Sequence, residues 1–351
     1  MKTYHRLWCD GCFDLCHFGH FNFMRQARQL CDELYVGVHN DAEVELNKAR
    51  PVFTLEERIE LVSACKWVTK AVPDAPYTTQ VDWVDRFNCD AVVHGDDIVL
   101  NADGFDTYHL IKKCNRFTTV PRTKAISTTN LIGRMIRLPK SELPEGFDLN
   151  LLKDIAGDAA SLHTYIPTTH RIAQFSEKVN SKANLNGPQR GDRVVYCDGT
   201  FDLLHPGHVS FLRKAKAMGD YLVVGVHDDP TMESLMCPAM PIMTLQERVL
   251  NVLAMKYVDD VIIGAPYVIT KELMDQIEPA IVVQGSAPTR TNDEDAFRVP
   301  KQLGIFRQIE SDYPEMSAKQ VVHRVLNNFA LYANRNKAKE QSAYEVHPDE
   351  K

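Results

Sequence analysis

The stretch WCDGCFDLCHFGH, residues 8–20, occurs a second time as YCDGTFDLLHPGH, residues 196–208. The two copies are 188 positions apart, and the offset is the same for LYVGVH, which begins at Leu34, and its match LVVGVH. Farther along, FTLEER matches MTLQER at an offset of 190 residues. A register kept over so many residues indicates an internally duplicated domain.

Each copy alternates patterns typical of strands with patterns typical of helices. An apolar run ends in Asp-Gly, an amphipathic helix is expected to begin near the second histidine, and a β-branched run follows. Thr54 with Glu57, and Thr244 with Glu247, have the spacing of capping boxes that begin a further helix. We therefore expect an α/β fold with two tandem Rossmann-like domains. Each would have a doubly wound parallel sheet and a ligand site at the carboxyl ends of its strands.

The duplication also predicts the domain organisation. We expect an N-terminal domain at 1–137, a linker at 138–192, a C-terminal domain at 193–333 and a charged tail at 334–351. The linker is rich in Pro, Gly, Asn and Ser, but its segment IPTTHRIAQFS is apolar. We expect this segment to pack onto one of the domains.

Charge and hydropathy exclude some classes of protein. The 351 residues carry a formal net charge of -7, whereas nucleic-acid-binding proteins usually have a basic surface. No apolar run of signal-peptide type opens the chain, and no stretch is apolar over the length of a transmembrane helix. We expect a cytoplasmic protein that binds no nucleic acid, and association into a homo-oligomer stays open.

The cysteines raise the question of a metal site. Cys9, Cys12 and Cys16 have spacing like that of metal ligands, and His17 lies beside them. A zinc site would need a second group of ligands, none follows, and the second copy keeps only Cys197 of the three cysteines. We expect reduced, mostly buried thiols and no metal held by the protein.

The H-x-G-H motif predicts a phosphate site in a strand-to-helix turn. Gly19 lets the backbone approach a ligand closely, and the N terminus of the following helix offers free N–H groups to an anion. His17 and His20 can then donate hydrogen bonds to the same phosphate.

These motifs resemble those of the cytidylyltransferase branch of the nucleotidyltransferase superfamily. The marks are CDGCFDLCHFGH, LNKARPVFTLEER, KWVTKAVPDAPY, VVHGDD and RTKAISTT, and the tandem arrangement is similar to that of ethanolamine-phosphate cytidylyltransferases. The resemblance implies the nucleotidyltransferase fold. It also implies a reaction of CTP with phosphoethanolamine, giving CDP-ethanolamine and pyrophosphate for phosphatidylethanolamine synthesis. Mg²⁺ is expected to bridge the phosphates of CTP, with no protein ligand assigned to it.

The resemblance also implies the roles of individual residues. The expected catalytic residues, which bind the phosphates, are His17, His20, Lys48 and Arg122. The expected nucleotide-binding residues are Cys12, Phe13, Gly19, His94, Gly95, Asp96, Asp97, Ser127, Thr128 and Thr129. Asp10 and Tyr77 are expected to bind the acceptor, although Asp10 could instead cap the turn and Tyr77 could belong to the core. Ala125 departs from the family glycine, so this loop is strained or displaced if the position needs a positive φ.

The second copy predicts a degenerate site. It keeps Asp198, Phe201, His205 and His208, has Thr200 in place of Cys12, and has Ser317 near the position of the phosphate-binding serine. However, Gln284 replaces His94, no lysine matches Lys48, and SDYPEMSAKQ replaces RTKAISTT. We expect one working site, in the first domain.

Several alternatives stay open. A class I aminoacyl-tRNA synthetase has a similar histidine turn, but the acidic charge and the absence of an evident anticodon-binding domain argue against it. RTKAISTT favours cytidine over an adenylyltransferase on the same fold. Lys48 and Arg122 argue against a non-catalytic nucleotide sensor, whereas the choice between phosphoethanolamine and another phosphorylated alcohol such as phosphocholine rests on the resemblance alone.

Overall fold

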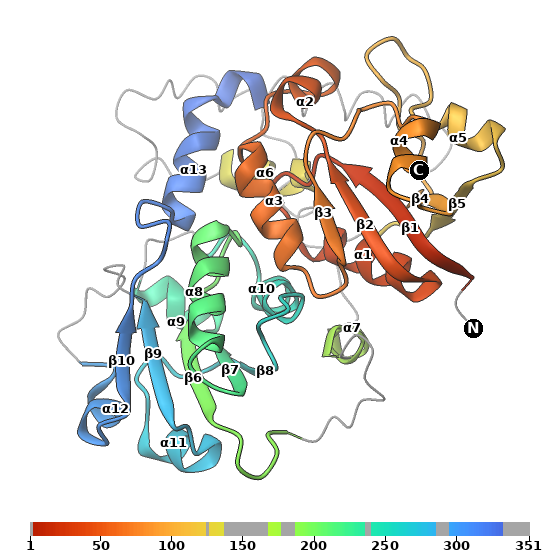
Figure 1. Ribbon diagram of the computed structural model, residues 1–351. Helices are drawn as coiled ribbons and strands as arrows, with labels where there is room; N and C mark the ends of the chain where they lie inside the picture. Colours follow the sequence, from red (N-terminus) through yellow and green to blue (C-terminus); the bar gives the residue numbers. More distant parts are fainter. Residues whose placement is uncertain are drawn as a thin grey trace.

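A computed structural model describes most of the chain (Figure 1). The described residues are 3–123, 126–136, 168–176, 187–235, 240–285 and 295–332. The predicted tail, most of the predicted linker and the position of Ala125 lie outside these residues.

The first copy folds around a five-stranded sheet in the order β3-β2-β1-β4-β5, in which every pairing is parallel. Its strands are β1 (Tyr4–Gly11), β2 (Cys31–Val38), β3 (Lys70–Val72), β4 (Ala91–Gly95) and β5 (Phe117–Val120). Its helices are α1 (Phe18–Leu30), α2 (Asp41–Asn47), α3 (Leu55–Ala64), α4 (Val81–Arg86), α5 (His109–Lys113) and α6 (Thr128–Ile136). The strand order reverses between β1 and β4, and ligands bind beyond the carboxyl ends of strands at such a reversal.

The second copy repeats this topology, with the order β10-β9-β6-β7-β8 and parallel pairing throughout. Its strands are β6 (Val194–Gly199), β7 (Tyr221–Val226), β8 (Asp260–Ile263), β9 (Ile281–Gly285) and β10 (Phe306–Ile309). Its helices are α8 (Pro206–Lys216), α9 (Asp229–Leu235), α10 (Leu245–Leu253), α11 (Lys271–Ile277), α12 (Arg298–Gln302) and α13 (Ala318–Asn327). The predicted fold class, two tandem doubly wound parallel sheets, is confirmed.

The helix starts follow from side-chain caps. Both predicted capping boxes are present, since the carboxylates of Glu57 and Glu247 accept hydrogen bonds from the backbone N–H groups of Thr54 and Thr244. Helix α1 begins earlier than predicted because the His17 imidazole itself caps it. Among the described residues the longest helix has 13 residues, and no helix is long and apolar enough to span a membrane.

A short helix from the predicted linker, α7 (Thr168–Ser176), packs against both copies. Phe175 is fully buried, and its ring meets the ring of Trp67 edge-on at a centroid distance of 5.0 Å. The same helix contacts α10 of the second copy. The prediction that this apolar segment packs onto a domain is confirmed.

Equivalent residues of the two copies contact each other reciprocally. The backbone N–H of Lys66 donates to Ala254 at 2.9 Å, and the N–H of Lys256, 190 positions later, donates to Ala64 at 2.9 Å. Reciprocal contacts of this kind define a two-fold arrangement. The two copies are therefore packed as the protomers of a symmetric dimer are, within one chain.

The copies also share one hydrophobic core. A single cluster of buried side chains includes Phe18 and Phe21 of α1, Leu250 of α10 and Val325 of α13. Helix α6 lies beside α13, and α3 beside α8 (Figure 1). The contact between the copies is thus an apolar interior and not a hydrated boundary between separate domains.

Candidate active site

The predicted site residues of the first copy gather beyond the carboxyl ends of β1 and β4. Asp10 lies near the end of β1, His17 caps α1 and His94 lies near the end of β4. Lys48 follows α2, and Arg122 follows β5. Four segments of the chain therefore supply the site, as expected where a strand order reverses.

The two histidines of the motif form a fixed pair. Their rings stack at a centroid distance of 4.0 Å, the Nδ1 of His17 accepts the Gly19 N–H at 3.2 Å, and the Nδ1 of His20 accepts the His17 N–H at 3.4 Å. Because both Nδ1 atoms are acceptors, each neutral ring carries its proton on Nε2. The His17 Nε2 is buried and has no hydrogen-bond partner among the described residues, which makes it a donor directed at a ligand.

Both imidazoles are neutral at neutral pH. Burial, followed by repulsion from His20 and from the Arg122 and Arg134 guanidinium groups, lowers the pKa of His17 well below its usual value. Burial, with repulsion from Lys48 and Arg122, lowers the pKa of His20 to about 3. The histidines are therefore hydrogen-bond donors, and the positive charge of the site comes from Lys48 and Arg122.

These two cations lie at the solvent-exposed side of the site. The Lys48 Nζ is 5.6 Å from the centroid of the Tyr77 ring. The Arg122 side chain is 56% exposed, and its Nη1 donates to an Asp97 carboxylate oxygen at 2.8 Å. The Arg122 backbone N–H donates to Asp96 at 3.0 Å. Because an exposed ion pair of this kind is weak, a phosphate can replace the Asp97 carboxylate.

A buried carboxylate lies at the bottom of the site. Asp10 is 2% exposed and accepts three hydrogen bonds, from Trp8 Nε1 at 2.8 Å, Thr79 Oγ1 at 2.7 Å and the Tyr108 hydroxyl at 2.7 Å. None of these three donors is a cation. All three are side chains, and none belongs to the turn that Asp10 could have capped.

Tyr77 lies near the same carboxylate. It is 4% exposed, its ring lies 5.0 Å from that of His39, and its hydroxyl has no hydrogen-bond partner among the described residues. Burial, followed by electrostatic interactions with Cys12 and Asp10, raises the Tyr77 pKa to about 12. The hydroxyl therefore stays protonated and able to donate, although the ring is also part of the interior.

The turn after β1 is strained and tightly packed. Phe13 has a φ of 51°, and its ring meets that of His20 at 5.7 Å. A Cβ at Gly19 would lie 2.9 Å from the His17 ring and 3.0 Å from Ile126. Close packing thus requires Gly19, in addition to the predicted approach of a ligand. The Cys12 carbonyl already accepts a hydrogen bond, which leaves its N–H as the group available to a nucleotide.

The N terminus of α6 faces this turn. The Ser127 Oγ accepts the Asn130 N–H at 3.1 Å, and the Thr128 hydroxyl donates to the Asp14 carbonyl at 3.0 Å. Thr129 follows in the first turn of the helix. The N–H groups of a helix start favour an anion. Of the VVHGDD segment, His94 packs on Tyr108 at 4.9 Å, and a Cβ at Gly95 would meet Asp97 at 2.6 Å.

Two residues that shape the site were not predicted from the sequence. The Asp14 carboxylate accepts the N–H groups of Val52 and Phe53, each at 2.9 Å, and the fully buried Arg58 donates to the Cys12 carbonyl at 2.6 Å. The equivalent residues of the second copy make the same contacts. Both copies have the same aspartate and arginine at these positions, and this repetition was the signal in the sequence. Because the second copy has lost other site residues but keeps these two, their role is structural.

The second site keeps the histidine pair but has lost the counterparts of Lys48 and Arg122. His205 and His208 stack at a centroid distance of 3.7 Å. Ser311 stands at the position of Arg122, two residues beyond β10, and the carboxylate of the next residue, Asp312, is bonded to Lys214 and Arg213. A neutral serine cannot offset the charge of a triphosphate.

The second copy has also lost the surroundings of the buried carboxylate. Tyr196, Ile269 and Phe297 stand where Trp8, Thr79 and Tyr108 donate to Asp10. The remaining residues of the predicted degenerate site are at their expected places. Asp198 is buried, Phe201 has a φ of 52°, the Thr200 carbonyl accepts from Arg248, and Ser317 caps α13.

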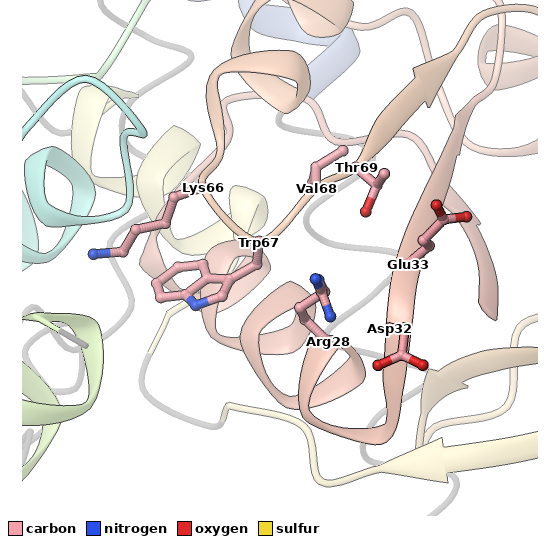
Figure 2. Close-up of a pocket in the computed structure, with 7 residues that line it drawn as sticks. All are labelled: Arg28, Asp32, Glu33, Lys66, Trp67, Val68 and Thr69. Carbon is pink, nitrogen blue, oxygen red and sulfur yellow. The ribbon is translucent and has the colours of Figure 1, made fainter. Parts of the chain in front are cut away.

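A cavity of about 420 Å³ opens elsewhere in the first domain. Figure 2 shows its lining residues, Arg28, Asp32, Glu33, Lys66, Trp67, Val68 and Thr69. Asp32 and Glu33 lie at the amino end of β2, opposite to the edge that carries the histidines. This cavity is therefore separate from the candidate active site.

Comparison with known proteins agrees with this geometry. The model of the cytidylyltransferase-like family matches residues 8–134 and 196–324. The chain belongs to this family of nucleotidyltransferases. Ethanolamine-phosphate cytidylyltransferase of Dictyostelium discoideum is 42% identical over 95% of this chain and 94% of its own length. The enzyme of the same name from Mus musculus is 39% identical over 95% of this chain and 89% of its own length.

By contrast, choline-phosphate cytidylyltransferase 2 of Arabidopsis thaliana matches 38% of this chain and 45% of its own length, at 36% identity. The relatives named ethanolamine-phosphate cytidylyltransferase match almost the whole chain, and this coverage shows the family to which the chain belongs. The protein is a member of the ethanolamine-phosphate cytidylyltransferases.

Proposed function

We propose that the protein transfers the cytidylyl group of CTP to phosphoethanolamine, giving CDP-ethanolamine and pyrophosphate for phosphatidylethanolamine synthesis. The observation that carries this proposal is the buried Asp10 carboxylate near the end of β1, the strand that leads into the turn with the histidine pair. It offers an anionic pocket for an ammonium group next to a cationic region for phosphates.

The acceptor needs no general base. The second pKa of a phosphate monoester is about 6, so the attacking oxygen is already largely ionised at neutral pH. It attacks the α-phosphorus of CTP and pyrophosphate leaves from the opposite side. Catalysis then consists of bringing two anions together and stabilising the charge that develops.

The donors of the first site fit this task. The Nε2–H groups of His17 and His20 would bind oxygens at the α-phosphorus, because both are fixed in one tautomer by their backbone contacts. Lys48 and Arg122 would neutralise the triphosphate from the solvent side. The N terminus of α6, with Ser127, would hold the outer phosphates.

The buried pocket would bind the amine. An ammonium group beside Asp10 would exchange its water shell for a carboxylate and for the faces of the surrounding aromatic rings. Tyr77 and Tyr108 would border it. A choline headgroup lacks N–H donors and is larger, so it would fit this hydrogen-bonding pocket less well.

Mg²⁺ would enter with CTP as part of the substrate. The groups expected to contact the phosphates are imidazole, ammonium and guanidinium donors, which do not ligate Mg²⁺, and the nearby Asp96 and Asp97 carboxylates are bonded to Arg122. Phosphate oxygens and water are therefore its expected ligands. Cytoplasmic location and association into homo-oligomers remain predictions.

The test is pyrophosphate release with CTP and three acceptors in parallel: phosphoethanolamine, phosphocholine and glycerol phosphate. We expect kcat/KM for phosphoethanolamine to exceed the other two values by at least about tenfold. A preference for phosphocholine would reassign the acceptor, and binding of CTP without turnover of any acceptor would favour a nucleotide sensor. Replacement of CTP by ATP should abolish release.

A further inference from the structure

A buried ion pair links the helix that carries Ser127 and Thr128 to the second domain. Arg134, in the last turn of α6, binds Glu247 of α10 through two hydrogen bonds, Nη1 to Oε2 at 2.6 Å and Nη2 to Oε1 at 2.9 Å. The side chains are 6% and 3% exposed. The pair therefore has little contact with water, and the loss of one partner would leave a buried charge without compensation.

Both partners of this pair are held in place. The Glu247 Oε2 also accepts the Thr244 N–H at 2.9 Å in the capping box of α10. The Arg134 Nη1 also donates to the Ile242 carbonyl at 3.3 Å. The carboxylate thus has a fixed position in the second domain and determines where the end of α6 lies.

The apolar face of α6 is held from the same side. Leu131, Ile132 and Met135 are buried, and the helix contacts α13 of the second domain (Figure 1). The charge of Arg134 is close enough to contribute to the lowered pKa of His17. A shift of α6 would therefore move both the N terminus of the helix and a positive charge near the histidine pair.

We propose that the second domain takes part in the reaction of the first through Glu247, a positioning residue that holds α6 and thereby places Ser127 and Thr128 against the triphosphate of CTP. This inference rests on the proposed function. It gives the degenerate domain a task in catalysis that does not require it to bind a nucleotide.

The chain contains a matched control for this proposal. Arg324 of α13 binds Glu57 of α3 through the same two contacts, at 2.7 and 2.8 Å, and each residue is 190 positions from its counterpart. This control pair holds the helix that faces the second site. Its side chains are more exposed, at 30% and 12%, so the two losses are compared through KM for CTP and not through stability.

The experiment compares Glu247→Gln with Glu57→Gln in the full chain, with CTP and phosphoethanolamine varied separately. We expect Glu247→Gln to raise KM for CTP about tenfold while KM for phosphoethanolamine stays within about twofold, since coupling through such contacts is typically of this size. We expect Glu57→Gln to leave both KM values within about twofold. Urea unfolding of both variants measures the stability that each pair supplies.

Equal changes of KM for CTP in the two variants, or a wild-type value in Glu247→Gln, would overturn the proposal. If Glu247→Gln does not fold, Arg134→Lys and Arg324→Lys replace the pair of variants, because lysine keeps the charge and loses the bidentate contact. Calorimetric binding of CTP without acceptor separates the two proposals. Positioning predicts weaker CTP binding in Glu247→Gln even if phosphoethanolamine is not the acceptor.

Discussion

At the scale of single residues, the chemistry of the site depends on histidines that are kept neutral. Both ring pairs lie at helix starts where burial makes protonation costly, and the first pair also faces Lys48 and Arg122. A neutral imidazole with Nδ1 occupied offers one donor in a fixed direction. The histidines therefore supply directional hydrogen bonds, and Lys48 and Arg122 supply positive charge.

His17→Ala should lower kcat by about 10² to 10³, because the loss of one preorganised donor to a transition-state oxygen has an effect of this size. His205→Ala is the control, since the second site lacks the cations. We expect its kcat to stay within about threefold of wild type. A larger loss from the His205 change would contradict the assignment of catalysis to the first domain.

Asp10→Asn should weaken binding of the acceptor and leave CTP unaffected. The substitution removes the negative charge and adds an amide N–H group beside the three donors that already bond to this side chain. A hydrogen bond to a charged group contributes about 1.5–3 kcal/mol, so KM for phosphoethanolamine should rise by about 10- to 100-fold. A rise confined to KM for CTP would show that Asp10 acts elsewhere.

His208→Asn tests the neutral histidines through stability, away from catalysis. Burial lowers the His208 pKa to about 3, whereas the unfolded chain binds the proton below about 6.5. The free energy of unfolding should therefore fall as pH falls through this window. Between pH 7 and pH 5 one such histidine accounts for up to about 2 kcal/mol.

The Asn variant keeps an acceptor for the His205 N–H and loses this titration. Urea unfolding at both pH values should give a smaller decrease for the variant than for wild type. Parallel pH profiles would mean that His208 is solvated enough to titrate normally.

At the scale of elements, the starts of α6 and α13 have the same kind of cap, but only the start of α6 is expected to bind phosphates. Ser127 and Ser317 cap equivalent helices with hydrogen bonds of 3.1 Å to the N–H groups of Asn130 and Gln320. Each copy keeps a stacked histidine pair, but Lys48 and Arg122 have no counterparts in the second copy.

Ser127→Ala and Ser317→Ala should each lower the free energy of unfolding by about 1 kcal/mol through loss of the cap. Only Ser127→Ala should also raise KM for CTP, because its helix start is the one expected to hold phosphates. Denaturant unfolding and steady-state kinetics on both variants separate the two effects. An unchanged KM in Ser127→Ala would remove this helix from the phosphate site.

Most elements of the fold could be predicted from the repeat. The strands around both Asp-Gly turns and the capping boxes at Thr54 and Thr244 have local signals that survive in both copies. The start of α1 was predicted too late, because histidine is an uncommon cap and the pattern reflects its ligand role as well. The loss of Arg122 from the second copy could also be predicted, because SDYPEMSAKQ replaces RTKAISTT there.

At the scale of the whole molecule, the two domains should unfold together because they share a core. All three tryptophans, Trp8, Trp67 and Trp83, belong to the first copy, so tryptophan fluorescence reports on that domain and, through Trp67, on its contact with α7. Far-ultraviolet circular dichroism reports on both domains. We expect the two urea transitions to coincide, as they do in cooperative unfolding. A dichroism transition that continues after fluorescence is complete would mean that the second domain is independently stable.

The arrangement of the domains could not be predicted from the sequence. Arg134 and Glu247 each have an ordinary local explanation, one as a basic residue at a helix end and the other as part of a capping box. Their contact forms only when the two folded domains pack against each other. The same is true of the donors around Asp10, which come from segments far apart in the chain and meet only when the sheet is assembled.

The reciprocal contacts between Lys66 and Ala254 and between Lys256 and Ala64 lie within one polypeptide. A pair of separate subunits with such an interface would come apart as the solution is made more dilute, and any site that depends on the partner would be lost with it. Covalent tethering removes that dependence, because the effective concentration of one half around the other is set by the linker. Each molecule of this enzyme therefore carries its supporting half at any abundance in the cell, and the two halves are free to diverge.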